Sequence, residues 1–188
     1  QEEGAEQISR MYAAEVQEAS DVFSVQVLSP MYKNPCGVDK LNELIQERTN
    51  QPSPEKTEYK NGKFIFRTGD KVMQKQNNYD KGVFNGDIGK IFAIHEDTIH
   101  VRYPEQDVRY EGKEIDEITL AYAITVHKSQ GSEYRTVIMA IVSSHAIMLQ
   151  RNLFYTAVTR AKRKVILVGM KRALLAAVQN IRTSSRFT

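Results

Sequence analysis

The 188-residue sequence contains a single cysteine, Cys36, and no tryptophan. One cysteine cannot form an internal disulfide, so a fold held by internal cross-links is excluded. No apolar run approaches the roughly 18 residues that a membrane-spanning helix needs, and residues 1–17 lack the apolar core of a secretion signal. We therefore expect a reduced, cytoplasmic protein with no membrane partner, long enough to bury a hydrophobic core unaided.

Acidic residues are missing from the end of the chain, where no Asp or Glu follows Glu133. Residues 134–188 carry ten Lys and Arg, whereas residues 1–133 carry 16 together with all 23 acidic residues. A basic segment of this density is typical of proteins that bind nucleic acid or a nucleotide phosphate. A solvated basic surface is the alternative, and charge by itself favours neither.

The sequence also lacks the motifs of a complete site for nucleotide hydrolysis. Its three Gly-Lys pairs are followed by Phe, Ile or Glu, so no phosphate-binding loop with a metal-binding Ser or Thr is present. The two most apolar strand-like runs lead into Ser143 and Gly169 rather than into a magnesium-binding acid. His95 and His100 lie five positions apart in a strand-like segment, a spacing that does not place both on one helical face. We therefore expect no metal site.

Hydrophobic periodicity predicts an α/β protein with an insertion. Helical spacing of apolar residues occurs in four segments, residues 1–20, 38–49, 150–162 and 170–180. Strand-like runs occur at residues 22–28, 137–142 and 165–168, and the last two are continuous enough for buried parallel strands. Residues 64–119 instead carry short strand-like runs separated by turn sequences such as Asn85-Gly86. We predict a parallel-sheet domain of residues 1–63 and 120–188, interrupted by a small β-barrel of residues 64–119.

Residues 123–133 are polar at most positions although they lie between apolar stretches. A turn after a strand could offer the hydroxyl of Thr125, the imidazole of His127, the ammonium of Lys128 and backbone N–H groups to phosphates. The alternative interpretation is a purely structural turn that Thr125 caps and Gly131 closes. The pattern leaves both interpretations open.

Residues 152–162 predict a helix with one apolar and one polar stripe. The polar stripe consists of Asn152, Thr156 and Arg160 at positions i, i+4 and i+8. No acidic residue lies three or four positions from Arg160, and Thr159 beside it could orient the guanidinium. Arg160 is then either a solvated arginine or one that is kept available for an external phosphate.

Together these segments resemble the C-terminal part of a superfamily-1 DNA helicase of the RecD-like family, the exodeoxyribonuclease V alpha-subunit type. Residues 125–133 resemble helicase motif V, and residues 155–162 resemble motif VI. Residues 27–31, with Gly37, Leu41, Asn42 and Gln46, resemble the motif IV region. Segments within residues 69–89 resemble the strands around the SH3-like insertion of the family. Motifs V and VI in this order make the resemblance specific.

The resemblance implies the second RecA-like motor domain of a helicase, with an inserted SH3-like β-barrel. In this family ATP and Mg²⁺ bind mainly to a first RecA-like domain, which this sequence does not contain, and the second domain closes over the nucleotide. By this resemblance Arg160 is the catalytic arginine finger, which neutralises charge on the γ-phosphoryl group. Residues facing ATP would be Gln130, Gly131 and Glu133, with Glu133 toward the ribose. Residues holding the backbone of single-stranded DNA would be Thr125, His127 and Lys128.

The resemblance also implies partners, namely single-stranded DNA, the N-terminal RecA-like domain of the same parent chain, and other exodeoxyribonuclease V subunits. The parent would move 5′ to 3′ along DNA in repair or recombination, and the present sequence would hydrolyse no ATP alone. The barrel is either a spacer or a wall of the DNA channel, with contacts from Lys71, Lys75, Tyr79 and Lys81. Two other functions stay open, the helicase portion of a conjugative relaxase and a free-standing nucleic-acid-binding module.

Overall fold

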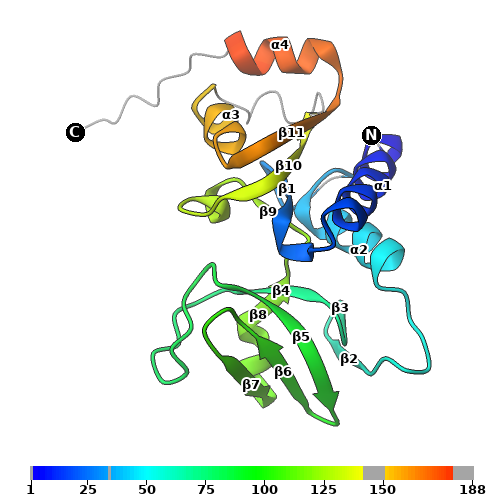
Figure 1. Ribbon diagram of the computed structural model, residues 1–188, viewed down its shortest axis with the longest axis vertical. Helices are drawn as coiled ribbons and strands as arrows, with labels where there is room; N and C mark the ends of the chain where they lie inside the picture. The colour runs from blue at the N-terminus through cyan, green and yellow to red at the C-terminus, as the bar shows by residue number, and fades with distance from the viewer. Residues whose placement is uncertain (1, 34, 142–150, 180–188) are drawn as a thin grey trace. The chain divides into compact units, whose positions relative to one another are not determined.

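The computed structural model describes residues 2–33, 35–141 and 151–179 (Figure 1). The chain divides into two compact units, one of residues 1–44 and 123–188 and the other of residues 45–122. Each unit has its own sheet structure, so each is described by itself.

The first unit is built on a parallel sheet with the strand order β11-β10-β1-β9 (Figure 1). Its strands are β1 (Val25–Ser29), β9 (Ala123–Thr125), β10 (Tyr134–Ile141) and β11 (Ala161–Gly169). Val25 of β1 pairs with Thr136 of β10, and Val27 pairs with Ala123 of β9. The central strands β1 and β10 are buried along almost their whole length, as strands covered on both faces are. The parallel-sheet α/β fold predicted from the sequence is confirmed.

Four helices accompany this sheet, and each follows the apolar spacing of its sequence. They are α1 (Glu2–Ala19), α2 (Val38–Thr49), α3 (Arg151–Val158) and α4 (Lys171–Gln179), with a short 3-10 helix, η1 (Val22–Ser24), before β1. Helix α1 packs against β1 and β10 and buries Ala5, Ile8 and Tyr12. Helix α3 packs against β10, β11 and α4.

Strand β11 differs from the buried strand predicted at residues 165–168. It is the last strand in the order and pairs only with β10. Its other side has no strand partner among the described residues, and Leu167 is 38% exposed. The continuous apolar run at residues 165–168 therefore belongs to an edge strand and not to a central, buried strand.

The second unit is antiparallel and contains the β region that the turn sequences predicted. A five-stranded sheet has the order β7-β6-β5-β4-β8, and β2 and β3 form a separate hairpin. The strands are β2 (Glu58–Asn61), β3 (Phe64–Arg67), β4 (Lys71–Gln74), β5 (Ile88–His95), β6 (Thr98–Arg102), β7 (Asp107–Glu111) and β8 (Ile118–Leu120), with the 3-10 helix η2 (Gly112–Glu117). Buried and exposed residues alternate along β7, so one face of the sheet forms the core.

Residues 45–63 lie with the antiparallel unit, although the sequence pattern placed them with the parallel-sheet domain. The reason is a buried carboxylate, that of Asp70, which is fully shielded from solvent. This carboxylate accepts hydrogen bonds from Gln46, Asn50, the backbone N–H of Arg67 and the hydroxyl of Tyr122, at 2.6–2.8 Å. Burial raises the pKa of Asp70, and the four hydrogen bonds oppose that rise.

Candidate functional site

The predicted strand-to-turn segment connects two strands of the parallel sheet. Strand β9 ends at Thr125, and the 3-10 helix η3 (His127–Ser129) with a turn at Gly131 leads to Tyr134, where β10 begins. Both strands run parallel to β1, so β9 ends at the carboxyl edge of the sheet and β10 begins at the amino edge. Residues 126–133 therefore return from one edge of the sheet to the other.

The returning segment is fixed by its own hydrogen bonds. The N–H of Val126 donates to the carbonyl of Ser29 at the end of β1 (3.2 Å), and the N–H of Ser132 donates to the carbonyl of Ser129 (3.1 Å). The buried hydroxyl of Ser129 donates to the carbonyl of Val126 (2.6 Å). Gly131 has a φ of +83°, a left-handed conformation that glycine adopts without steric cost. The segment is thus an ordered turn in its own right.

The three predicted DNA-binding residues lie together at the carboxyl edge, but in different settings. His127 is exposed and Lys128 is half-buried. Thr125 is 7% exposed, and its hydroxyl oxygen accepts a hydrogen bond from the N–H of Lys128 at 3.3 Å. The N-cap residue of η3 is Val126, one position after the predicted Thr125, and the bond from Lys128 shows that the Thr125 hydroxyl stabilises the turn. His127 and Lys128 are therefore the side chains of this turn with surface exposed to an external ligand.

Arg160 is not on a helix, so the polar stripe predicted for residues 152–162 is wrong at its last member. Helix α3 ends at Val158, and β11 begins at Ala161. The hydroxyl of Thr159 donates to the carbonyls of Tyr155 (2.9 Å) and Thr156 (3.0 Å). A side chain that bonds back to the preceding turn in this way competes with the helix backbone and favours its end.

The guanidinium of Arg160 lies against the bend that follows Gly131. Its Nη1 donates to the carbonyl of Ser132 (3.3 Å), and its Nη2 lies 3.5 Å from the hydroxyl oxygen of Thr159. The backbone carbonyl of Arg160 accepts from the N–H of Tyr134 (2.8 Å), which joins the starts of β10 and β11.

The hydrogen-bonding capacity of Arg160 is only partly used. Its Nε is buried and has no hydrogen-bond partner among the described residues. Among the residues that the structure describes, no carboxylate forms an ion pair with this side chain. Buried donors in native proteins are nearly always bonded, and an exception calls for an explanation. A half-buried guanidinium with a spare donor is suited to an anion supplied from outside.

The other residues that were predicted to face the nucleotide lie on this bend or directly before it. Gln130 and Gly131 are exposed. Glu133 forms an ion pair with Lys162 of β11 (3.2 Å), and both side chains are about 60% exposed. The sequence pattern did not indicate this ion pair, because Glu133 and Lys162 are far apart in the sequence. Lys162 lies two positions after Arg160. The structure thus brings Arg160 to the bend of residues 131–133, whereas His127 and Lys128 lie at the carboxyl edge.

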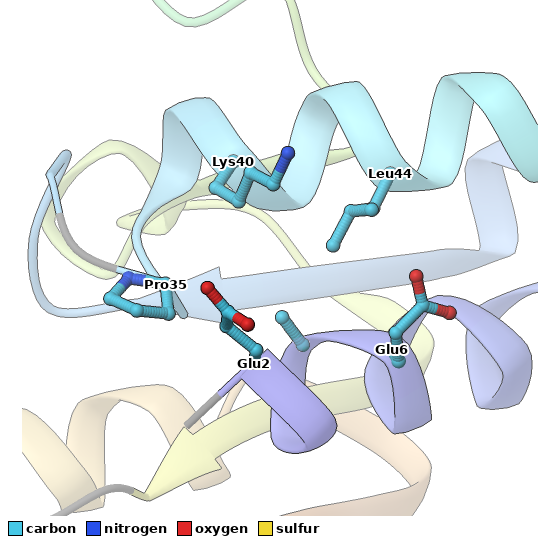
Figure 2. A pocket seen from close by; sticks show the side chains of 6 residues that line it. Glu2, Glu6, Pro35, Lys40 and Leu44 are labelled. Atoms are coloured by element: carbon cyan, nitrogen blue, oxygen red, sulfur yellow. The ribbon is translucent and has the colours of Figure 1, made fainter.

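A cavity of about 530 Å³ lies between α1 and α2 in the first unit (Figure 2). Figure 2 shows Glu2 and Glu6 on α1, and Lys40 and Leu44 on α2, around this space. None of the predicted site residues lines it. We therefore assign the candidate site to the returning segment and Arg160, and not to this cavity.

His95 and His100 lie on neighbouring strands, as the strand-like sequence indicated, with ring centroids 5.6 Å apart. Within residues 2–33, 35–141 and 151–179, no three His, Cys, Asp or Glu side chains are grouped to hold a metal ion. No helix in these ranges has the length and apolarity to cross a membrane.

Comparisons with known proteins match both units. Residues 41–103 match the family model of the SH3 domain of ATP-dependent RecD-like DNA helicases. Residues 120–168, which include the returning segment and Arg160, match the model of the UvrD-like helicase C-terminal domain.

Curated relatives extend the match over most of the chain. The ATP-dependent RecD2 DNA helicase of Deinococcus radiodurans is 37% identical over 165 residues, which cover 88% of this chain and 23% of that protein. The RecBCD enzyme subunit RecD of Mycolicibacterium smegmatis is 32% identical over 151 residues, which cover 78% of this chain and 25% of that protein. The chain thus spans about a quarter of the length of these relatives.

A solved structure supports the fold. A Pif1 helicase, from a study of DNA unwinding at forked double-stranded DNA, superposes with a TM-score of 0.55 at 22% identity. The superposition covers 85% of this chain and 42% of that one. At this level of identity the likeness shows a shared fold.

Proposed function

This chain belongs to the RecD-like DNA helicases, and from that premise we propose that it is the second motor domain of a longer, ATP-dependent DNA helicase. The parallel-sheet unit is the RecA-like domain 2A, and residues 45–122 are its SH3-like insertion, 2B. The observation that carries this proposal is the spare donor of Arg160 beside the bend of residues 131–133. The parent translocates 5′ to 3′ in repair or recombination and is cytoplasmic.

Arg160 is the arginine finger in this proposal. A guanidinium whose Nε has no partner in the part of the chain that the structure describes fits a phosphate oxygen, because its planar donors match such an oxyanion. ATP, bound with Mg²⁺ mainly by the first motor domain of the parent chain, supplies the γ-phosphoryl group. Arg160 donates to the oxygens on which negative charge accumulates during transfer. Glu133, held by Lys162 on the same bend, faces the ribose, and Gln130 and Gly131 line the nucleotide.

The carboxyl edge of the sheet holds single-stranded DNA. His127 is exposed and Lys128 is half-buried on one short turn, where they contact the phosphate backbone. The hydroxyl of Thr125 acts indirectly, because it accepts from the N–H of Lys128 and shapes the turn. One segment, residues 126–133, thus connects the DNA contacts with the nucleotide edge. The other partners are the first motor domain of the parent and other exodeoxyribonuclease V subunits.

The decisive experiment replaces Arg160 in the parent helicase. We expect Arg160→Ala and Arg160→Lys to lower the kcat for DNA-stimulated ATP hydrolysis by about 10³-fold or more, because lysine cannot supply a planar fork of donors. Nucleotide affinity should stay within about threefold, since most contacts to ATP come from the first domain. Kinetics and equilibrium binding of a fluorescent nucleotide measure the two effects.

Arg163→Ala is the matched control, because Arg163 is an exposed arginine of β11, three positions after Arg160. It should hydrolyse ATP at close to the unmodified rate. Near-normal turnover in Arg160→Ala, or an equal loss in Arg163→Ala, would overturn the finger role.

A further inference from the structure

Helix α2 carries a row of buried amide side chains. Asn42, Gln46 and Asn50 follow one another at helical spacing, the last directly after the helix ends, and are 3%, 5% and 6% exposed. Asn and Gln are seldom buried unless every polar group is bonded. We call these three residues the amide row. Their partners show what the row holds in place.

Asn42 holds the first residue of strand β9. Its Nδ2 donates to the carbonyl of Ala123 (3.0 Å), and its Oδ1 accepts from the N–H of Ala123 (2.8 Å). This reciprocal pair is the one that a neighbouring strand would make. Among the described residues, β9 is at the edge of the sheet and pairs with β1 alone, so Asn42 occupies the position of a further strand.

Gln46 and Asn50 hold the residue before β9 through a carboxylate. Both donate to Asp70 at 2.7 Å. Asp70 in turn accepts from the hydroxyl of Tyr122 (2.8 Å), a side chain that is 2% exposed. Two consecutive residues, Tyr122 and Ala123, are therefore fixed by one row of amides.

Strand β9 needs such support because it has little stability of its own. It is three residues long, from Ala123 to Thr125, and the turn beyond it bonds back to β1 through Val126 and Ser29. Short edge segments with few hydrogen bonds open most easily in native proteins.

We propose that the amide row and Asp70 position β9, and thereby set the conformation of the turn that carries His127 and Lys128. These are positioning residues, since each acts through Tyr122 or Ala123 rather than on a ligand. The positioning rests on the geometry described here, whereas its consequence for DNA rests on the proposed function.

The test compares two buried tyrosine hydroxyls of the same unit. Tyr122→Phe removes the bond to Asp70. Tyr103→Phe removes a bond to the hydroxyl of Tyr110 (2.8 Å), at a residue that is 5% exposed and far along the chain from β9. Amide hydrogen exchange of the 188-residue chain, followed by NMR, should show about tenfold lower protection at residues 123–129 in Tyr122→Phe only.

Asn42→Asp provides an independent variant, because it keeps the acceptor for the N–H of Ala123 and loses the donor to its carbonyl. The same amides should lose protection. Equal changes in Tyr122→Phe and Tyr103→Phe, or unchanged protection at residues 123–129 in both Tyr122→Phe and Asn42→Asp, would overturn the proposal.

A second measurement in the parent helicase separates the positioning from the proposed function. Tyr122→Phe should raise the Kd for single-stranded DNA about threefold to tenfold, with kcat at saturating DNA changed less than twofold. Lower protection together with unchanged DNA affinity would leave the positioning intact and would contradict DNA binding by the turn.

Discussion

Two polar clusters of this protein, one around Asp70 and one at the bend after Gly131, differ in how many of their hydrogen-bonding groups have partners. Around Asp70, both carboxylate oxygens are buried and accept two bonds each. At the bend that follows Gly131, the side chain of Gln130 is exposed, and the Nε of Arg160 is buried without a partner among the described residues. A polar cluster in which every group is hydrogen-bonded stabilises the fold, whereas a buried donor without an acceptor indicates a site for a ligand.

The largest expected loss of stability comes from removing the acceptor at the centre of the satisfied cluster. Asp70→Ala would remove all four hydrogen bonds that this carboxylate accepts, and a buried donor that loses its acceptor costs about 1–3 kcal/mol. We expect the free energy of unfolding to fall by at least about 3 kcal/mol in urea denaturation. Asp97→Ala, at an exposed turn residue, should change it by less than about 0.5 kcal/mol. A loss of stability below about 1 kcal/mol for Asp70→Ala would contradict a stabilising role for this cluster.

A smaller loss is expected when one member of the amide row is removed. Asn42→Ala leaves the N–H and carbonyl of Ala123 without their side-chain partner, and we expect a cost of about 1–3 kcal/mol. Lys40→Ala on the same helix is the control, since its ion pair with Glu43 is about half exposed. In thermal and urea unfolding, Asn42→Ala should be clearly less stable than Lys40→Ala. Equal stabilities of the two variants would contradict a supporting role for Asn42.

Arg160 should matter much less for stability than for turnover. Arg160→Met keeps most of the buried side-chain volume and removes the unpartnered Nε. Because only a 3.3 Å bond to Ser132 and a 3.5 Å contact to Thr159 are lost, we expect the free energy of unfolding to change by less than about 1 kcal/mol. A loss above about 2 kcal/mol, measured by urea denaturation, would instead assign this arginine to the fold.

The smallest effect is expected at the exposed ion pair on the bend. Glu133→Gln removes the charge that faces Lys162, and both side chains are about 60% exposed. Solvent and salt screen such a pair, so the free energy of unfolding should change by less than about 0.5 kcal/mol. A difference between low and high salt that exceeds this value would show that the pair helps to hold the bend.

Much of the fold followed from local sequence patterns. The bounds of α2 match the helix predicted for residues 38–49 because periodicity and turn residues set both ends. Where the predicted bounds were wrong, the cause was a contact with another residue or strand that the local sequence pattern does not show. Strand β2 lies outside the predicted β region of residues 64–119 because it pairs with β3. Helix α3 ends before residue 162 because the hydroxyl of Thr159 bonds back to the helix.

The candidate site followed from the sequence less completely than the fold. The resemblance supplied the residues that are proposed for the site. The contact between Arg160 and Ser132 could not be predicted, because it depends on how the starts of β10 and β11 align. The amide row was also missed as a unit. Asn42 and Gln46 stand beside Leu41 and Ile45, and a polar stripe next to an apolar one ordinarily faces water. Only the approach of Asp70 and Ala123 identifies these amides as interior groups.

The link between β9 and β10 is short for two strands that run in the same direction. Residues 126–133 make this crossing, whereas such crossings usually take about a dozen residues or more. The crossing contains the 3-10 helix η3 and the turn at Gly131, so both ends of the segment are set by ordered turns. Because only three residues separate His127 from Gly131, we expect a displacement of the chain near Gly131 to be transmitted to His127.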